Sequence, residues 1–397
     1  MPDPVLVDLA AETRELAASK EHLERQRLWT ALLDLEPVRP LVNYYMYPRV
    51  WARDIAPGSL RHTNGIEAVV ELQLRCRLWQ AKHYPDDTPL LPVVWVDCAR
   101  PPRGPDWMWG VELLVERTSE DGSYRPVPPI QKEADIAKVR PPRYQEDNEG
   151  SRRLVNEVCE RIDGILPVKT RSDELHWGPF EYVVRLRGLE NLLFDLYERP
   201  EFVRALMQRV TDGMIAYQQE REAAGAVDAM ASWFGHVPCH HHIPAGEGHL
   251  LKRCWAYIHA QSSASISPDM YAAFIHPYNK QLAALVGLTY YHGCEDLGQK
   301  CRIIQDLPGL RLFHVSPWTP VDPVVHCLGN TCVLEVHSHP TNVLWADSRD
   351  QVVRELRERH KAVQGIPHVL ALADVETARD RVEALIFWAE TARGMVA

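Results

Sequence analysis

Short apolar runs alternate with longer amphipathic stretches along most of the chain. Eight of these runs are expected to form strands, near residues 41–46, 91–97, 164–170, 226–233, 288–292, 311–316, 332–337 and 368–373. Near-continuous apolar runs are typical of parallel strands that are covered on both faces. The stretches between most of them have helical spacing and the length that a parallel crossover needs. The pattern therefore predicts an α/β protein built from eight βα units.

Eight such units favour a closed barrel, so we expect a single (β/α)8 TIM barrel over residues 37–397. A doubly wound open sheet is the alternative, and it is weakened because no G-x-G-x-x-G follows the first strand. Residues 1–36 are predicted to form an N-terminal helical extension, with one helix over 8–36. The Pro-rich residues 100–150 are predicted to be an insertion after the second strand, with a hairpin at Asp121-Gly122.

Charge and cysteine content narrow the class of protein. The formal net charge of the 397 residues is −10, which argues against a nucleic-acid or anionic-membrane surface. No apolar run approaches the length of a membrane span, and the first residues lack the pattern of a secretory signal. The nine cysteines are odd in number and form no compact framework, which favours reduced thiols and a cytoplasmic location. The sequence leaves the oligomeric state open, and a homodimer is one of the alternatives.

Polar side chains collect where the predicted strands end. In barrels of this kind the catalytic groups lie at the carboxyl ends of the strands. These ends carry Tyr47 and Arg49, Asp97, Arg171 and Glu174, Trp233 and His236, His292 with Cys294 and Glu295, Ser316 and Trp318, His337 and His339, and Asp374 with Glu376. The strand starts carry much less chemistry, and this one-sided distribution favours an enzyme.

His292 and Cys294 are separated by one glycine, so along a strand both side chains point to the same face. Imidazole and thiolate are ligands that suit zinc. His337 and His339 repeat the spacing two strands later, and Asp374 at the last strand is a further candidate ligand. The alternative is a packed histidine beside a buried thiol, with Pro340 marking an ordinary turn.

The densest histidine cluster is the Pro- and Gly-punctuated stretch 236–249, "HVPCHHHIPAGEGH". It is either a second metal-binding segment, a loop over the substrate, or a solvated loop without a role. We take His236 as its strongest functional candidate. The sequence contains no P-loop, no G-x-S-x-G and no H-E-x-x-H motif.

The segment 266–322, "ISPDMYAAFIHPYNKQLAALVGLTYYHGCEDLGQKCRIIQDLPGLRLFHVSPWTPVD", resembles the uroporphyrinogen decarboxylase superfamily, which also holds zinc-dependent corrinoid methyltransferases. Residues 185–212 and 25–42 are similar to the helical segment before the fourth strand and to the N-terminal region of a divergent branch. The arginine-rich M-R-Q-A-G-R motif of the decarboxylases is absent, since the corresponding stretch reads "NYYMYPRVWARD" with only Arg49 and Arg53. The resemblance implies a TIM barrel.

For the methyltransferases, the resemblance matches His292-Gly293-Cys294 to their H-x-C motif. Their second cysteine has no counterpart in "VLALADVET", so Asp374, Glu376, His337 or His339 would complete the ligand set. Cys294-Glu295 also matches the end of a G-C-C-E pattern in the divergent branch. The resemblance implies zinc as cofactor, with Glu295 as a further candidate ligand, and a corrinoid on a partner protein as methyl acceptor.

The leading hypothesis is therefore methyl transfer from a small O- or N-methylated substrate to a corrinoid protein. Trp233, Tyr291, Trp318 and Arg49 are the expected substrate-binding residues, and His236, Asp97 and Arg171 the expected catalytic ones. A second hypothesis is a metal-independent lyase that uses Arg171, Arg49 and Asp97 on a carboxylated substrate. A third is a binding barrel without catalytic activity, or a corrinoid-handling partner whose catalytic half is lost.

Overall fold

The computed structural model describes residues 1–117, 124–228 and 250–397. Its strands are β1 (Leu41–Tyr44), β2 (Val94–Asp97), β3 (Leu114–Arg117), β4 (Tyr124–Val127), β5 (Val168–Arg171), β6 (Trp255–His259), β7 (Leu288–His292), β8 (Leu310–Val315), β9 (Val333–His337) and β10 (His368–Leu372). Its α-helices are α1 (Pro4–Ala17), α2 (Lys20–Leu33), α3 (Pro48–Val50), α4 (Gly65–His83), α5 (Asn148–Arg161), α6 (Pro179–Arg187), α7 (Leu189–Glu198), α8 (Pro200–Ala223), α9 (Pro268–Phe274), α10 (His276–Ala283), α11 (Cys301–Ile304), α12 (Val321–Leu328), α13 (Pro340–Leu344), α14 (Arg349–Ala362) and α15 (Val382–Val396). A π-helical turn, η1 (Trp51–Ile55), and short 3-10 turns, η2 (Glu133–Lys138), η5 (Leu251–Arg253) and η6 (Gln261–Ser263), complete the described elements.

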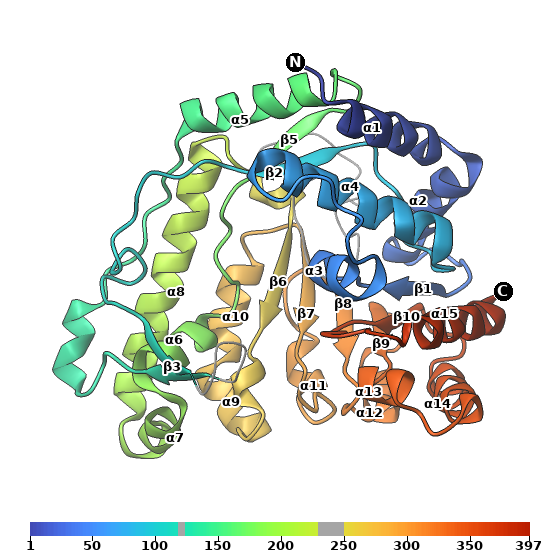
Figure 1. Cartoon of the computed structure of the whole chain (residues 1–397). Helices are drawn as coiled ribbons and strands as arrows, with labels where there is room; N and C mark the ends of the chain where they lie inside the picture. Colours follow the sequence, from blue (N-terminus) through green and yellow to red (C-terminus); the bar gives the residue numbers. More distant parts are fainter. Residues whose placement is uncertain (118–123, 229–249) are drawn as a thin grey trace.

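The main sheet has six parallel strands in the order β1-β10-β9-β8-β7-β6, and β2 and β5 form a separate parallel pair. Helices cover these strands on the outside: α10 packs beside β6 with α8 and α9 against it, and α15 packs beside β1 with α13 and α14 against it (Figure 1). The α/β class with a parallel central sheet agrees with the prediction. Within the described residues, however, the sheets do not close into a ring, and one parallel bridge, Trp177 to Ile258, links the β5 side to β6. A closed TIM barrel is therefore not confirmed.

The gap between β1 and β2 has a clear physical cause. On its edge away from β10, β1 meets the segment before β2, and carboxylates take the place of a strand partner. The amide of Val42 donates to Asp87 Oδ2 at 2.8 Å and the amide of Tyr44 donates to Asp86 Oδ2 at 3.2 Å. Both aspartates are buried. The edge amides of β1 are satisfied without a neighbouring strand, so buried backbone groups do not force closure here.

Seven of the predicted apolar runs overlap observed strands, and the fourth lies mostly outside the described residues. Residues 226–228 are irregular, and residues 229–233 lie outside the described part of the chain. The strand beside β7 is instead β6, which follows a stretch rich in His, Pro and Gly. Strand β6 has only five residues and ends in His259, so its apolar pattern is weaker than that of the longer run at 226–233.

The N-terminal segment forms two helices rather than the single predicted one. The break falls at Ser19, whose hydroxyl accepts a hydrogen bond from the His22 amide at 3.4 Å and caps α2. The apolar face of α2 packs under the starts of the strands, against Leu41, Trp255, Tyr290, Leu312, Val333 and Val369. Helix α1 packs on α4 and the β2–β5 pair. The extension thus covers the amino ends of the strands.

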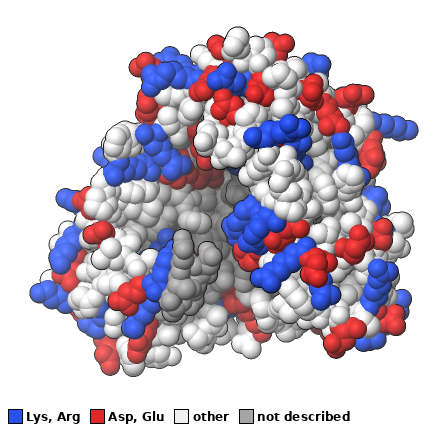
Figure 2. Space-filling view, viewed as in Figure 1, with Lys and Arg blue, Asp and Glu red and all other residues white. Residues whose placement is uncertain are grey.

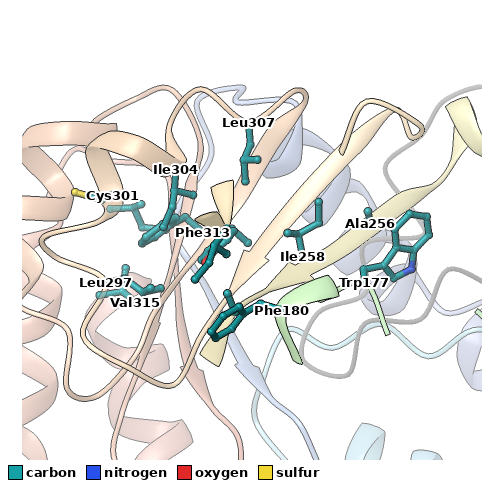
Figure 3. Packing of buried hydrophobic residues seen from close by; sticks show 14 of the residues in the cluster. Trp177, Phe180, Ala256, Ile258, Leu297, Cys301, Ile304, Leu307, Phe313 and Val315 are labelled. Atoms are coloured by element: carbon teal, nitrogen blue, oxygen red, sulfur yellow. The ribbon is translucent and has the colours of Figure 1, made fainter. Parts of the chain in front are cut away.

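Outward-facing strand residues are covered by the helical layer. Ile258, Phe313 and Val315 pack against Leu297, Ile304 and Leu307 from the segments that follow β7 (Figure 3). Strands β3 and β4 pair antiparallel as expected for a hairpin, whose predicted turn at Asp121-Gly122 lies outside the described residues. In the described part of the chain, every helix is too short or too polar to cross a membrane.

Candidate metal centre

Strand alternation and register bring three histidines together at the carboxyl ends of neighbouring strands. His292 is the last residue of β7, His314 lies near the end of β8, and His337 ends β9. The ring centroids of His292 and His314 are 4.0 Å apart, and those of His314 and His337 are 4.1 Å apart. All three side chains are buried. Because successive side chains along a strand alternate between faces, three in-register strands place these rings side by side.

Two groups of residues have the geometry to hold a metal ion. The first is His292, Cys294 and His314, and the second is His314, Glu335 and His337. In each group one ligand atom per residue lies within 4.8 Å of the others. Zinc bonds of about 2.0–2.3 Å in a tetrahedral site place ligand atoms roughly 3.3–3.8 Å apart. The side chains of either group would therefore need to move only slightly toward one another to reach that spacing. The imidazole and thiol donors of the first group are those that suit zinc.

The predicted pair His292 and Cys294 is separated by a glycine that the Glu295 side chain covers closely. A Cβ atom at Gly293 would lie 2.3 Å from Glu295 Oε2, because the Glu295 side chain folds back over this residue. The segment is held further by β8 and the turn that follows it. Ser316 Oγ and Thr319 Oγ1 donate to the Glu295 carbonyl at 2.9 and 3.0 Å. Cys294 is therefore presented by a turn with fixed backbone contacts.

Burial dominates the ionisation of Cys294. Burial, followed by the nearby carboxylates of Asp374, Glu295 and Glu335, raises the pKa of the thiol to about 12. The thiol is therefore protonated at neutral pH when no cation is bound. A metal ion must displace this proton, since the thiolate is the ligand form of cysteine.

A single carboxylate, Glu335, connects the histidines beneath the Cys294 turn. His337 Nε2 lies 2.9 Å and His314 Nδ1 3.2 Å from Glu335 Oε2, and the Tyr290 hydroxyl donates to the same oxygen. Burial alone would raise the pKa of this carboxyl, but His337 and His314 outweigh it and hold the pKa well below its usual range. Glu335 is therefore an ionised acceptor at the centre of the site.

A cavity of about 270 Å³ opens beside these groups. It is lined by Cys294, His314, Pro317, Trp318, His337, Ser338, His339, Pro340, Thr341, Ala373 and Asp374. Asp374 accepts a hydrogen bond from the Tyr47 hydroxyl at 3.0 Å and has a φ of 57°, a left-handed conformation that non-glycine residues seldom adopt. Trp318 is 57% exposed at the rim of the cavity.

The other predicted metal ligands lie at different places around this cavity. His339 and Asp374 line it but belong to neither ligand group. His339 Nδ1 accepts from the Thr341 amide at 3.2 Å and caps helix α13. Glu295 is buried outside the cavity lining, and its carboxylate oxygens have no hydrogen-bond partner within the described residues. Burial raises the pKa of this carboxyl to about 7.

The predicted catalytic and substrate-binding residues mostly do not converge here. Asp97 and Arg171 pair with each other at 3.3 Å on the ends of β2 and β5, outside the cavity lining. Arg49 pairs with Glu376 and stacks over Tyr47 at 4.7 Å.

Of the predicted aromatic residues, Trp318 lines the cavity and Tyr291 does not. The Tyr291 hydroxyl contacts that of Tyr271 at 2.7 Å and its ring stacks on Phe313, on the helix-covered face of the sheet. With His292 pointing inward, alternation sends Tyr291 outward. Trp233 and His236 lie outside the described residues.

The prediction missed His314 and Glu335, although the signal was present. In "LRLFHV" and "VLEVH", His314 and Glu335 are polar residues with apolar residues on both sides, at positions that the register aligns with the histidine of β7. A polar residue buried in a core strand needs a hydrogen-bond partner, and this requirement could have identified both residues from the sequence.

Comparisons with known proteins give a match in structure only. No family model matches this sequence, and no curated protein is similar to it in sequence. Among solved structures, the chain is similar to a methyltransferase from Methanosarcina mazei, with a TM-score of 0.55 and 16% identity over 94% of this chain and 99% of that one. At this identity the similarity establishes a shared fold over nearly the whole chain.

Proposed function

We propose that this protein is a zinc-dependent methyltransferase that moves a methyl group from a small methylated substrate to a reduced corrinoid on a separate protein. The observation that carries the proposal is the convergence of His292, Cys294 and His314 beside a cavity at the carboxyl ends of the strands. The overall similarity to a methyltransferase, and the resemblance of the H-x-C motif, support the same reaction class.

The residues present fit a zinc ion. His292, Cys294 and His314 would hold the ion with two imidazoles and one thiolate, a set of three protein donors of the kind that catalytic zinc sites use. A bound zinc ion would supply Lewis acidity toward the oxygen or nitrogen that carries the methyl group. In the proposed transfer, the bond from that atom to the methyl carbon would break with its electron pair left on the heteroatom, and a reduced corrinoid would provide the pair for the new bond.

The cavity lining favours a neutral or positively charged methyl donor. Among the described residues that line it, Asp374 is the carboxylate, and neither Lys nor Arg is present. Trp318 at the rim offers an aromatic face of the kind that binds methylated ammonium groups. The Tyr47 hydroxyl holds Asp374 in place, so the carboxylate is positioned before a substrate arrives.

The lyase alternative has no comparable support. It requires Arg171 and Arg49 to bind a substrate carboxylate, but each already pairs with a carboxylate of the protein and neither lines the cavity. Acidic and basic side chains are also interspersed over the face shown in Figure 2, without a broad basic surface for an anionic partner.

Elemental analysis of the purified protein tests the metal centre. We expect about one zinc ion per chain, lost in His292→Ala, Cys294→Ala and His314→Ala. Cys327→Ala is the matched control, because Cys327 is also a half-buried free thiol and belongs to neither metal-binding group. Zinc that survives all three substitutions would disprove the ligand assignment.

Methyl transfer is tested with free cobalamin reduced to the Co(I) state and a panel of small methyl ethers, methylamines and quaternary ammonium compounds. We expect loss of the Co(I) absorbance with at least one neutral or cationic donor, and no reaction in Cys294→Ala. Zinc-loaded protein that transfers no methyl group from any donor on the panel, to free cobalamin or to corrinoid protein, would argue against the function.

A further inference from the structure

The second group of potential ligands contains a buried carboxylate that also contacts the first group. Glu335 and His337 are both buried, and Glu335 lies opposite His314 in the register of β8 and β9. Two roles fit such a residue: it can bind a cation directly, or it can orient a histidine that does. The contacts around its two oxygens decide between them.

The contacts converge on one oxygen, Oε2. Tyr290 donates its hydroxyl proton to it, His314 Nδ1 lies 3.2 Å away, and His337 Nε2 lies 2.9 Å away. The Tyr290 hydroxyl is 3.3 Å from His314 Nδ1, and since its proton goes to Glu335, the Nδ1 proton of His314 is left to bridge to the carboxylate. An imidazole nitrogen that donates a proton cannot bind a metal ion at the same time.

We infer that Glu335 is a positioning residue that fixes the tautomer of His314 and so directs its Nε2 to the metal. This inference rests on the proposed zinc site. Histidine ligands of metals usually donate their other ring N–H to a carboxylate or carbonyl, which orients the ring and increases its basicity. Here the carboxylate also holds His337, the cavity-lining residue of the next strand, in the same network.

Histidine tautomers measured by nitrogen-15 NMR test the inference without any metal. In the apoprotein we expect His314 as the neutral Nδ1–H tautomer. In Glu335→Gln the neutral amide replaces the charged acceptor, so this preference should weaken. An Nε2–H tautomer of His314 in the wild type would overturn the inference whatever the metal content.

Cobalt(II) titration of the apoproteins supplies the second readout, with the thiolate-to-cobalt charge-transfer band reporting Cys294. We expect Glu335→Gln to keep this band while its Kd for cobalt rises 10- to 100-fold, the usual cost of losing such a partner. Tyr290→Phe removes one hydrogen bond to Glu335 and should raise the Kd for cobalt only a few-fold. This milder variant tests the same network if Glu335→Gln fails to fold.

Glu71→Gln is the matched control. Glu71 is a fully buried glutamate that contacts His62 Nδ1 at 2.8 Å, away from the cavity. It should lose stability without a change in cobalt Kd. A wild-type Kd in Glu335→Gln would overturn the positioning role, and so would a cobalt spectrum showing one ligand fewer, because Glu335 would then itself be a ligand. A wild type that binds neither cobalt nor zinc would refute the proposed function, while the NMR result would still stand on its own.

Discussion

The buried carboxyl of Glu295 makes the stability of this protein depend on pH in a direction opposite to that of most acidic groups. The side chain is 7% exposed and neither oxygen has a hydrogen-bond partner among the described residues. Burial raises its pKa from an ordinary value of 4.5 to about 7. The informative change is Glu295→Gln, which keeps the shape of the side chain and removes the ionisation.

The direction of this pH dependence follows from whether the folded or the unfolded state holds the Glu295 proton. Between pH 4.5 and 7 the folded protein keeps the Glu295 proton that the unfolded chain has already lost. Raising the pH through this window therefore lowers the free energy of unfolding. At about 1.4 kcal/mol per pH unit, the interval corresponds to a loss of roughly 3 kcal/mol in the wild type, which Glu295→Gln should not show.

Urea unfolding of the metal-free proteins at pH 5, 6, 7 and 8 measures this difference. Other buried acids, such as Asp86 with a pKa raised to about 6, are shared by both proteins and cancel. Asp135→Asn serves as control: hydrogen bonds from Lys138 and from the Gln131 and Lys132 amides hold the pKa of Asp135 at about 2, so this variant should shift the curve by a constant amount over the range. Parallel curves for wild type and Glu295→Gln would refute the reasoning.

Four further predictions are open to direct measurement. Trp29→Ala, which empties a fully buried position under the strands, should cost about 3–5 kcal/mol in urea unfolding. Gly178→Ala should cost about 1–3 kcal/mol, because its Cβ would lie 2.8 Å from the His259 carbonyl; an unchanged unfolding midpoint would contradict this. Asp374→Asn should raise KM for a cationic methyl donor about tenfold and leave KM for a neutral donor unchanged. Zinc binding at pH 7 should release a proton from Cys294, seen as a buffer-dependent enthalpy in calorimetry, and that proton should disappear in Cys294→Ala.

The fold was largely predictable where burial on both faces leaves a simple signal. Strands β1, β7, β8, β9 and β10 are runs of buried residues that the apolar pattern located within a few positions. The pattern could not reveal that, within the described residues, β1 and β2 do not pair, because this depends on the partners of the β1 edge. Those partners are the Asp86 and Asp87 side chains, which the sequence shows only as two acidic residues after a helix.

The site was predictable only in part, for a related reason. The spacing predicted that His292 and Cys294 share one face. In the structure both belong to one potential ligand group, and Cys294, just beyond the end of β7, lines the same cavity as His337. Spacing within one strand does not give the register between strands. His314 and Glu335 therefore became visible only once β7, β8 and β9 were aligned. The same alternation that turns His292 inward sends Tyr291 to the opposite face, a consequence that a list of strand-end residues overlooks.

In the proposed zinc site, His314 would take the place of the second cysteine of the H-x-C resemblance. A third ligand only needs a side chain that lies near His292. The strand β8 pairs directly with β7, whereas β10 is separated from β7 by β8 and β9. His314 lies on that strand with its ring 4.0 Å from that of His292, whereas Asp374, near the end of β10, lines the cavity without joining the group. The proposed ligand set would then be distributed over adjacent strands, with Glu335 on the next strand supporting it and Asp374 left to contact a substrate.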